Sequence, residues 1–287
     1  MANMTVANGL YTPELWAKEL NRLMMDSGVM LDCVNTKYEG LIKNEGDTVH
    51  IQTPGAVTVG NYDDVTAINY QALDGDTQTL VIDQKKYWGF VVKDIEKVQA
   101  NVDYAQAYIK NAKKALVNAQ DAFLLGKAAD ADINNQIGDV TLTKDNVYSK
   151  IVDIRTKLRE ANAIDDNGLD GTNKKPWLVV SPAILGVILQ APEFIHATKA
   201  GDETLRKGAV GTIAGVDIKE STVLKAVDSK TTILAGTTEA ITFAQQIIKV
   251  ETLKDKDFFG DYVRGLYVYG AKTVNPKCLV TMDVTIG

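Results

Sequence analysis

The feature that most constrains this chain is a β-rich excursion over residues 45–92, because such a ribbon is too thin to bury a core of its own. Val49 and Ile51 alternate with polar residues, and a Pro-Gly turn at residues 54–55 follows them. Residues 78–92 then form a second β-rich run with apolar residues at alternate positions. Because an isolated two-stranded ribbon is only marginally stable in water, we expect this one to rest on something else, such as another chain.

Residues 94–127 carry the strongest helical signal in the sequence. Their apolar residues recur at spacings of three and four, which places them on one face of a helix. Asp103 is a good N-terminal cap, so we expect a break near residues 101–103 and a main helix from Asp103 to Gly126, about 35 Å long. The apolar face is predicted to be core rather than a coiled-coil seam, because small Ala residues fill many of its positions. It comprises Ile95, Val98, Val102, Ala105, Ile109, Ala112, Leu116, Ala119 and Phe123.

The remaining segments mix short helices and strands. Thr12-Pro13 can begin a short amphipathic helix on an arm, and a second helix is expected over residues 143–163. The order of ribbon, helices, mixed segment and β-rich tail indicates an α+β protein rather than a regular alternation of strand and helix. The second helix should turn Val147, Ile151, Ile154 and Leu158 inward; the later elements are a strand at 177–180, a helix from Ser181 to Leu189, a glycine-punctuated hairpin ending at 216–218, and strands at 232–235, 240–243 and within 247–284.

The sequence offers little catalytic chemistry. Its two histidines, His50 and His196, lie far apart, and it contains neither a Gly-x-Ser-x-Gly nucleophile motif nor a Gly-x-x-x-x-Gly-Lys-Ser/Thr phosphate loop. Two distant cysteines, Cys33 and Cys278, do not complete a zinc site with these histidines. The acidic loop 165–171 begins like a calcium loop but lacks the glutamate at the twelfth position. We therefore expect no catalytic, cofactor or metal site, and a structural or interaction protein rather than an enzyme.

Charge and cysteine content limit the partners and the compartment. The net charge is −6, and no run of five or more Lys and Arg residues marks a nucleic-acid-binding patch. Tyr87, Trp88 and Phe90 could stack on bases, but without a flanking basic cluster they are interpreted as cross-strand packing. The N-terminal residues lack a secretory signal, and no apolar run is long enough to span a membrane. The two cysteines are therefore expected to be free thiols in a protein made in a cytoplasm.

Three groups of segments, taken in order, cover nearly the whole chain. The first is Gly46–Val49 with Leu80–Phe90 and Asp94–Glu96; the second is Trp177–Pro182 with Glu193–Ile195 and Gly211–Asp217; the third is Ala240–Gln245 with Phe259–Asp261 and Arg264–Lys272, ending near Pro276. In this order they resemble the major capsid (coat) proteins of tailed bacteriophages. The first group looks like an extended loop running into a long spine helix, the second like an axial domain, and the third like the return into a peripheral domain.

The resemblance implies an α+β fold of the Hong Kong 97 type, built from five segments. Residues 1–40 would form an N-terminal arm, and residues 41–92 an extended β-hairpin loop. Residues 93–172 would form a peripheral domain with the spine helix, and residues 173–244 an axial domain. Residues 245–287 would return to the peripheral domain as C-terminal strands.

The resemblance also implies a function. Pentamers and hexamers of such a protein tile an icosahedral head shell that encloses the double-stranded DNA of a tailed phage or prophage, and the shell matures from a procapsid. Residues 1–44 are too few for a long scaffolding segment, so a separate scaffolding protein is expected, together with a portal protein. The mildly acidic chain would hold DNA without sequence-specific contact. No membrane is expected to take part, and the virion protein would be assembled in the cytoplasm of the host bacterium.

Two alternatives from other classes stay open. The first is an encapsulin-like compartment, a protein cage of the same fold that loads an enzyme instead of DNA. The second is an enzyme whose site the motifs do not show. A terminase or portal gene beside this one would favour the capsid, and an activity screen of the purified monomer would test the enzyme.

Candidate subunit contacts follow from the ribbon and from the C-terminal strands. The ribbon is too thin to cover its own apolar residues, so we expect its tip to contact a neighbouring subunit. Charged residues of the C-terminal strands are candidates for charge pairs between subunits, which salt would weaken. The candidates are Val57, Val59, Tyr62, Asp63 and Asp64 at the tip, and Lys254, Lys256 and Arg264 in the C-terminal strands.

Overall fold

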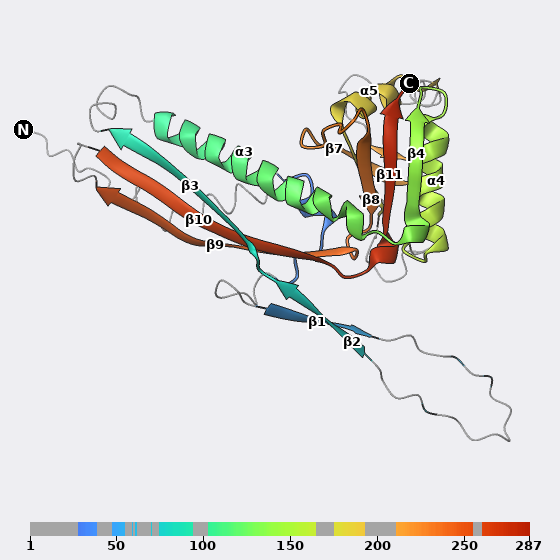
Figure 1. Cartoon of the computed structure of the whole chain (residues 1–287), viewed down its shortest axis with the longest axis horizontal. Coiled ribbons are helices and arrows are strands. Elements are labelled where there is room, and N and C mark those ends of the chain that lie inside the picture. The colour runs from blue at the N-terminus through green and yellow to red at the C-terminus, as the bar shows by residue number, and fades with distance from the viewer. Residues whose placement is uncertain are drawn as a thin grey trace, which may run out of the picture.

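Three β-sheets organise the described part of the chain (Figure 1). The structure, a computed structural model, describes residues 28–38, 48–54, 59, 61, 70, 75–93, 103–164, 175–192, 211–254 and 260–287. Within these residues, the α-helices are α3 (Asp103–Leu125), α4 (Val147–Glu160) and α5 (Pro182–Leu189), and the strands are β1 (Thr48–Pro54), β2 (Gly75–Val81), β3 (Gln84–Lys93), β4 (Gln136–Leu142), β5 (Trp177–Val180), β6 (Thr212–Ile213), β7 (Val216–Glu220), β8 (Thr231–Gly236), β9 (Ile241–Lys254), β10 (Gly260–Thr273) and β11 (Leu279–Ile286). The strand orders are β1-β2, β3-β10-β9 and β4-β11-β8-β5-β7-β6.

The first sheet is the predicted ribbon. β1 and β2 pair antiparallel, from Thr48 opposite Val81 to Pro54 opposite Gly75. The ribbon projects away from the rest of the molecule, as Figure 1 shows. The prediction of an extended hairpin is therefore confirmed for its base.

The prediction that the ribbon continues to residue 92 is wrong. β3 leaves the ribbon after residues 82–83 and pairs antiparallel with β10 instead. Leu80, Ile82 and Trp88 are all buried, so the alternation of buried and exposed residues continues from β2 into β3. For this reason the sequence pattern does not mark the point where the chain changes sheets.

α3 lies along one face of the β3-β10-β9 sheet (Figure 1). The predicted main helix is confirmed, because α3 begins and ends within one residue of its predicted bounds. Leu116 of α3, Trp88 of β3 and Val263 of β10 belong to one buried core. Gln120 and Asp121 of α3 are also buried, which their polar side chains did not indicate.

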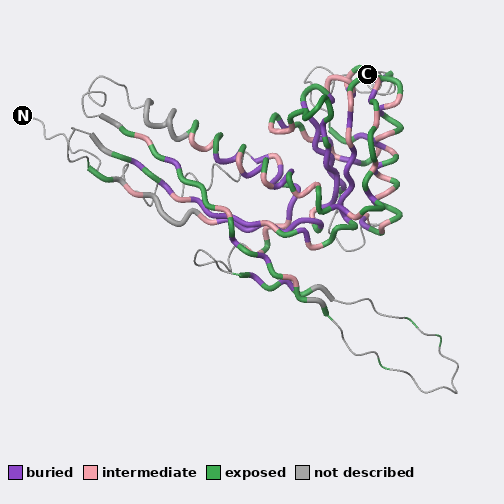
Figure 2. Tube along the Cα trace, viewed as in Figure 1, coloured by how far each residue is buried: buried purple, intermediate pink, exposed green. Residues whose placement is uncertain are grey.

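The six-stranded sheet carries α4 and α5. α4 contacts both α5 and β11, and its four predicted inward residues are all buried. The hydroxyl of Ser181 caps α5 by accepting a hydrogen bond from the N–H of Ile184 at 3.4 Å, and Pro182 occupies the first turn. Ala214 and Gly215, both with positive φ, form the tight turn between β6 and β7. Figure 2 shows most of the buried residues in this sheet and where the three-stranded sheet meets it.

The predicted segment boundaries do not follow the sheets. The six-stranded sheet takes β4 from segment 93–172, β5 to β8 from segment 173–244, and β11 from segment 245–287. The chain enters this sheet after α3, leaves it with β9, and returns to it with β11. Continuous segments therefore cannot describe the two sheet units.

The described part of the predicted N-terminal arm, residues 1–40, belongs to the core. Met30 is fully buried. The backbone N–H groups of Val29 and Met30 donate hydrogen bonds to the two carboxylate oxygens of Asp121, at 3.2 and 3.3 Å. The short helix predicted within the arm and the acidic loop 165–171 lie outside the described residues.

Candidate subunit interface

The base of the ribbon is anchored on the three-stranded sheet. Val49 and Ile51 of β1 and Leu80 of β2 are buried, and they form a small core with Ala244 of β9 and Val268 of β10. This core is separate from the main core of the molecule. The ribbon is therefore held to its own subunit by a few apolar contacts at one end.

Two further contacts fix the ribbon where it crosses the sheet. Gly270 of β10 lies so close to the carbonyl oxygen of Val81 that a Cβ at this position would collide with it. The side-chain amide of Gln78 donates a hydrogen bond to the carbonyl oxygen of Val274 at 3.0 Å. The ribbon thus departs from the sheet in a defined direction.

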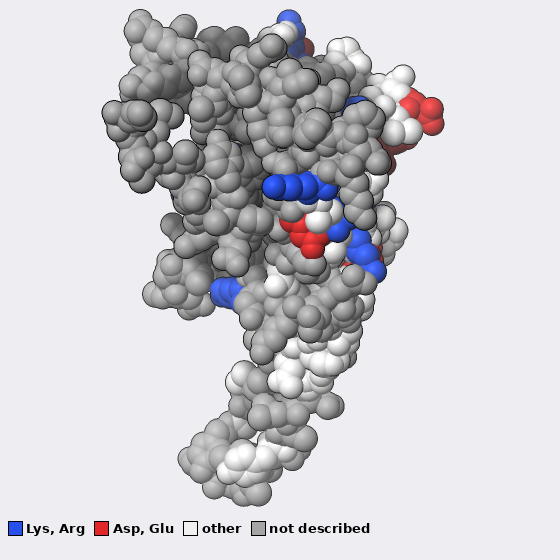
Figure 3. Space-filling model, turned by 90° about the vertical axis from the view of Figure 1, so that its left-hand side faces the viewer, with Lys and Arg blue, Asp and Glu red and all other residues white. Residues whose placement is uncertain are grey.

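Beyond its base, the ribbon exposes apolar side chains. Val59 is 92% exposed and Tyr70 is 87% exposed, and both lie between the ends of β1 and β2. In Figure 3 the described residues of the ribbon, at the bottom of the view, are mostly white rather than charged. The expectation of an uncovered apolar residue at Val59 is confirmed. The other tip candidates, Val57, Tyr62, Asp63 and Asp64, lie outside the described residues.

A second apolar surface lies on the face of the three-stranded sheet that α3 leaves open. Directly opposite residues of an antiparallel pair point to the same face, and the register places Tyr262 opposite both Val91 and Leu253. Tyr87 shares this face, because it lies four positions before Val91 on the same strand. Tyr87 is 86% exposed, and the other three side chains are between 39% and 47% exposed. We call Tyr87, Val91, Leu253 and Tyr262 the outer sheet face.

The ribbon is anchored on the same side of the sheet as the outer sheet face. Leu266 lies opposite Tyr87 in the register and packs against the small core of the ribbon. On the opposite side, Trp88 and Phe90 stack with ring centroids 5.7 Å apart. The interpretation of these aromatic residues as packing is therefore confirmed for Trp88 and Phe90, but it is wrong for the exposed Tyr87.

The charged candidates on the C-terminal strands differ in their surroundings. Arg264 donates hydrogen bonds from Nε and Nη2 to Oε2 of Glu251, at 2.9 and 2.6 Å, across the β9-β10 pair. Arg264 therefore belongs to an ion pair within its own subunit and does not carry a lone charge. Lys254 is exposed at the end of β9, and Lys256 lies outside the described residues.

The described residues show no catalytic arrangement. The ring Nδ1 of His50 lies 3.3 Å from Oγ1 of Thr79 on the surface of the ribbon, and His196 lies outside the described residues. Within the described ranges, no group of three or more His, Cys, Asp or Glu side chains could hold a metal ion. The same ranges contain no helix with the length and hydropathy that a membrane span requires. Cys33 and Cys278 are thiols outside any disulfide, as expected; both are buried, and burial raises the pKa of Cys33 to about 12.

We compared the sequence and the fold with those of known proteins. No family model and no curated protein matches the sequence. A solved structure from Mycobacterium phage Che8 has 27% sequence identity and a TM-score of 0.68, over 89% of this chain and 91% of that chain. The capsid of the cyanophage P-SCSP1u has 15% identity and a TM-score of 0.65, over 89% of this chain and 86% of that chain. This chain has the Hong Kong 97-type fold of phage capsid proteins.

The capsid fold extends beyond phage structures. A virus-like particle from Pyrococcus furiosus has 14% identity and a TM-score of 0.55, over 94% of this chain and 98% of that chain. The fold expected from the resemblance is thus confirmed. Of the structures that share it, the one from the cyanophage P-SCSP1u is a capsid and the one from Pyrococcus furiosus is a virus-like particle.

Proposed function

We propose that this chain is the major capsid protein of a tailed phage or prophage. The observation that carries the proposal is a capsid fold matched over nearly the full length of both chains, with 27% identity to the structure from phage Che8. The ribbon supplies the physical reason for assembly, because a single subunit leaves Val59 and Tyr70 exposed. Many copies, grouped as pentamers and hexamers, form an icosahedral shell around double-stranded DNA.

In this shell, the ribbon of one subunit lies on the outer sheet face of the next. Val59, Tyr70 and Tyr87 are the most exposed large apolar side chains among the described residues. Burial of such a side chain contributes about 1.5–3 kcal/mol. A modest contact of this kind is sufficient in a shell, because it is repeated around every subunit.

Charged residues flank this contact. The acidic tip residues Asp63 and Asp64 are proposed to meet the cationic residues Lys254 and Lys256 of the neighbouring sheet. Arg264 and its partner Glu251 lie within the outer sheet face and align the two surfaces. Exposed charge pairs are screened by salt, so assembly should weaken as ionic strength rises.

The test is a pair of tyrosine variants of the full chain. Tyr87→Asp places a charge on the outer sheet face, whereas Tyr148→Asp changes an exposed tyrosine of α4. Wild type and Tyr148→Asp should form shells or tubes under the electron microscope, and Tyr87→Asp should remain as folded subunits. Normal shells from Tyr87→Asp would overturn the proposed contact, and the absence of any assembly from wild type with a scaffolding protein present would overturn the capsid function.

Several partners belong to the proposal. A separate scaffolding protein and a portal protein guide assembly in the cytoplasm of the host bacterium. Packaged DNA is held without sequence-specific contact, in keeping with the net charge of −6. The chain itself has no enzymatic activity. The three-stranded sheet with α3 is assigned to the peripheral domain, and the six-stranded sheet to the axial domain.

The structural match to the virus-like particle from Pyrococcus furiosus supports one alternative function, a protein cage that loads an enzyme instead of DNA. This alternative is weaker, because the match has a TM-score of 0.55 against 0.68 for the phage Che8 structure. The contents of particles purified from the native source separate the two functions. Nuclease-protected DNA supports the capsid, and a co-purifying enzyme supports the cage.

A further inference from the structure

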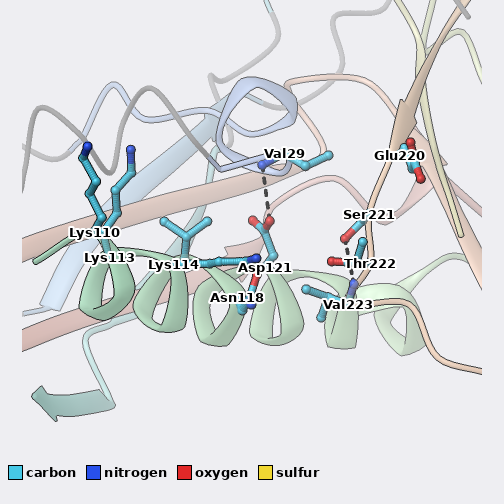
Figure 4. Close-up of a pocket in the computed structure, with 11 residues that line it drawn as sticks. Val29, Lys110, Lys113, Lys114, Asn118, Asp121, Glu220, Ser221, Thr222 and Val223 are labelled. Atoms are coloured by element: carbon cyan, nitrogen blue, oxygen red, sulfur yellow. Dashed lines mark hydrogen bonds between the residues drawn. The ribbon is translucent and has the colours of Figure 1, made fainter. Parts of the chain in front are cut away.

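A pocket of about 570 Å³ lies where α3 meets the six-stranded sheet (Figure 4). One wall is α3, from Lys110 to Asp121, and the opposite wall is the turn that follows β7. Val29 of the N-terminal segment closes one side, as Figure 4 shows. The pocket does not belong to the ribbon or to the outer sheet face.

The pocket combines an apolar floor with a cationic rim. Val29, Val117 and Val223 provide the apolar part of the lining. The rim carries three lysines of α3 at positions i, i+3 and i+4, which lie on one side of a helix. These are Lys110, Lys113 and Lys114.

The acidic residues of the lining leave the cationic rim available. Asp121 is the buried carboxylate, and the N–H groups of Val29 and Met30 already occupy its two oxygens. Glu220 lies on the opposite wall. Among the described residues, no carboxylate forms an ion pair with the three rim lysines.

The walls of the pocket are held in place before any partner binds. Asp121 ties the N-terminal segment to α3, as described above. On the other wall, the hydroxyl of Ser221 accepts a hydrogen bond from the N–H of Val223 at 3.3 Å, which fixes the turn after β7. A partner would therefore meet a formed surface, which lowers the entropy lost on binding.

We propose that this pocket docks an acidic amphipathic segment of the assembly partner, the separate scaffolding protein of the proposed function. An apolar side chain of that segment enters between Val117 and Val223, and flanking carboxylates meet the lysine rim. An apolar floor favours a protein segment over DNA, because phosphate groups gain nothing from apolar walls. The inference rests on the proposed function for the identity of the partner only.

The experiment measures binding of a fluorescent helical peptide of Glu and Leu residues to the full chain, kept as unassembled subunits. The variant K110E/K114E changes two exposed rim lysines, and the matched control K144E/K277E changes two exposed lysines elsewhere. We expect the rim variant to weaken binding at least about tenfold and the control to bind like wild type. Val223→Ser should weaken binding several-fold, whereas Val227→Ser, at a residue 72% exposed outside the pocket, should not.

Other outcomes decide against the proposal. No binding of the peptide by wild type, or equal binding by K110E/K114E, would overturn it. Tight binding of a DNA duplex that the rim variant abolishes would reassign the pocket to packaged nucleic acid. Shell formation is scored separately by electron microscopy, so a failure of the docking site is distinguished from a failure of the capsid function.

Discussion

The indole ring of Trp88 lies against the backbone of Gly265, the residue directly opposite it on β10. A Cβ at position 265 would come within 2.5 Å of the ring. Trp88 is in turn stacked on Phe90 and belongs to the core beneath α3. The close packing of α3 on its sheet thus depends on the absence of a side chain at residue 265.

Gly265→Ala should therefore destabilise the subunit. The added methyl group has to displace the indole ring, and overpacking of this kind costs about 1–3 kcal/mol. Gly89→Ala is the matched control, because its Cβ would meet its nearest neighbour at 3.5 Å, an ordinary contact. Thermal unfolding should give a lower Tm for Gly265→Ala than for Gly89→Ala, and equal values would contradict the packing argument.

Leu116→Asp should prevent stable folding. Leu116 is 5% exposed and lies in the main core, so the variant would bury a carboxylate without a partner, at several kcal/mol. Ala115→Asp places the same charge on the exposed side of the same helix. We expect insoluble or degraded protein from the first variant and soluble protein from the second. Wild-type solubility and Tm for Leu116→Asp would show that this face of α3 is not core.

Asp121 should give the subunit a pH-dependent stability. Burial raises the pKa of its carboxyl above the ordinary 3.8, and the N–H groups of Met30 and Val29 oppose the shift. The folded state therefore binds this proton more tightly than the unfolded chain, so the free energy of unfolding falls as pH rises through the raised pKa. Asp121→Asn cannot titrate. Urea unfolding is measured at a series of pH values that spans the raised pKa. The free energy of unfolding of the wild type should fall relative to that of the variant as pH rises, and a constant difference between the two would be evidence against this linkage.

Deleting residues 56–64 should separate folding from assembly. The buried contacts of the ribbon base involve Val49, Ile51 and Leu80, which the deletion leaves in place. We expect a soluble, folded subunit that sediments as a single species and forms no shells. Normal shells from the deletion variant would exclude the ribbon tip as an assembly contact.

The shell should be held together without covalent bonds. In some shells of this fold, a ribbon lysine joins an asparagine of a neighbouring subunit. Here the ribbon-side lysines Lys85 and Lys86 lie on β3, and residues 253–258 offer Asp and Lys but no Asn. A carboxylate ionised at neutral pH is a poor acyl donor, with an unperturbed pKa of about 3.9. Particles boiled in detergent should run as one band at 31.2 kDa, and a ladder that survives reduction would overturn the expectation.

Local patterns predicted the elements whose formation depends on neighbouring residues. Spacing of three and four placed Ile151, Ile154 and Leu158 inward on α4, and alternation identified the strands of the ribbon. Local patterns could not predict sheet membership, because the partner of β3 begins only at Gly260. The pairing of β4 with β11 leaves no local signal for the same reason.

For the buried polar residues and the candidate subunit interface, too, some features could be predicted from the sequence and others could not. Gln120 is polar, as residues at exposed helix positions usually are, but its side-chain oxygen accepts a hydrogen bond from the hydroxyl of Tyr267 on β10, 2.8 Å away. Val59 was predicted as an exposed contact because the thin ribbon makes burial impossible. The exposure of Tyr87 could not be predicted, because an alternating pattern does not reveal which face of a sheet is covered by a helix. The lysine rim of α3 was visible in the sequence only as separate charges.

The position of β11 has a consequence for the timing of biosynthesis. β11 lies inside the six-stranded sheet, with β4 on one side and β8 on the other. Residues 279–286 are translated after both neighbours, so the sheet cannot close until these residues have been synthesised. The pairing of β4 with β11 is also slow, because a long loop has to close first. A growing chain therefore has its ribbon exposed before the rest of the subunit is complete, and chaperones would meet it in that interval.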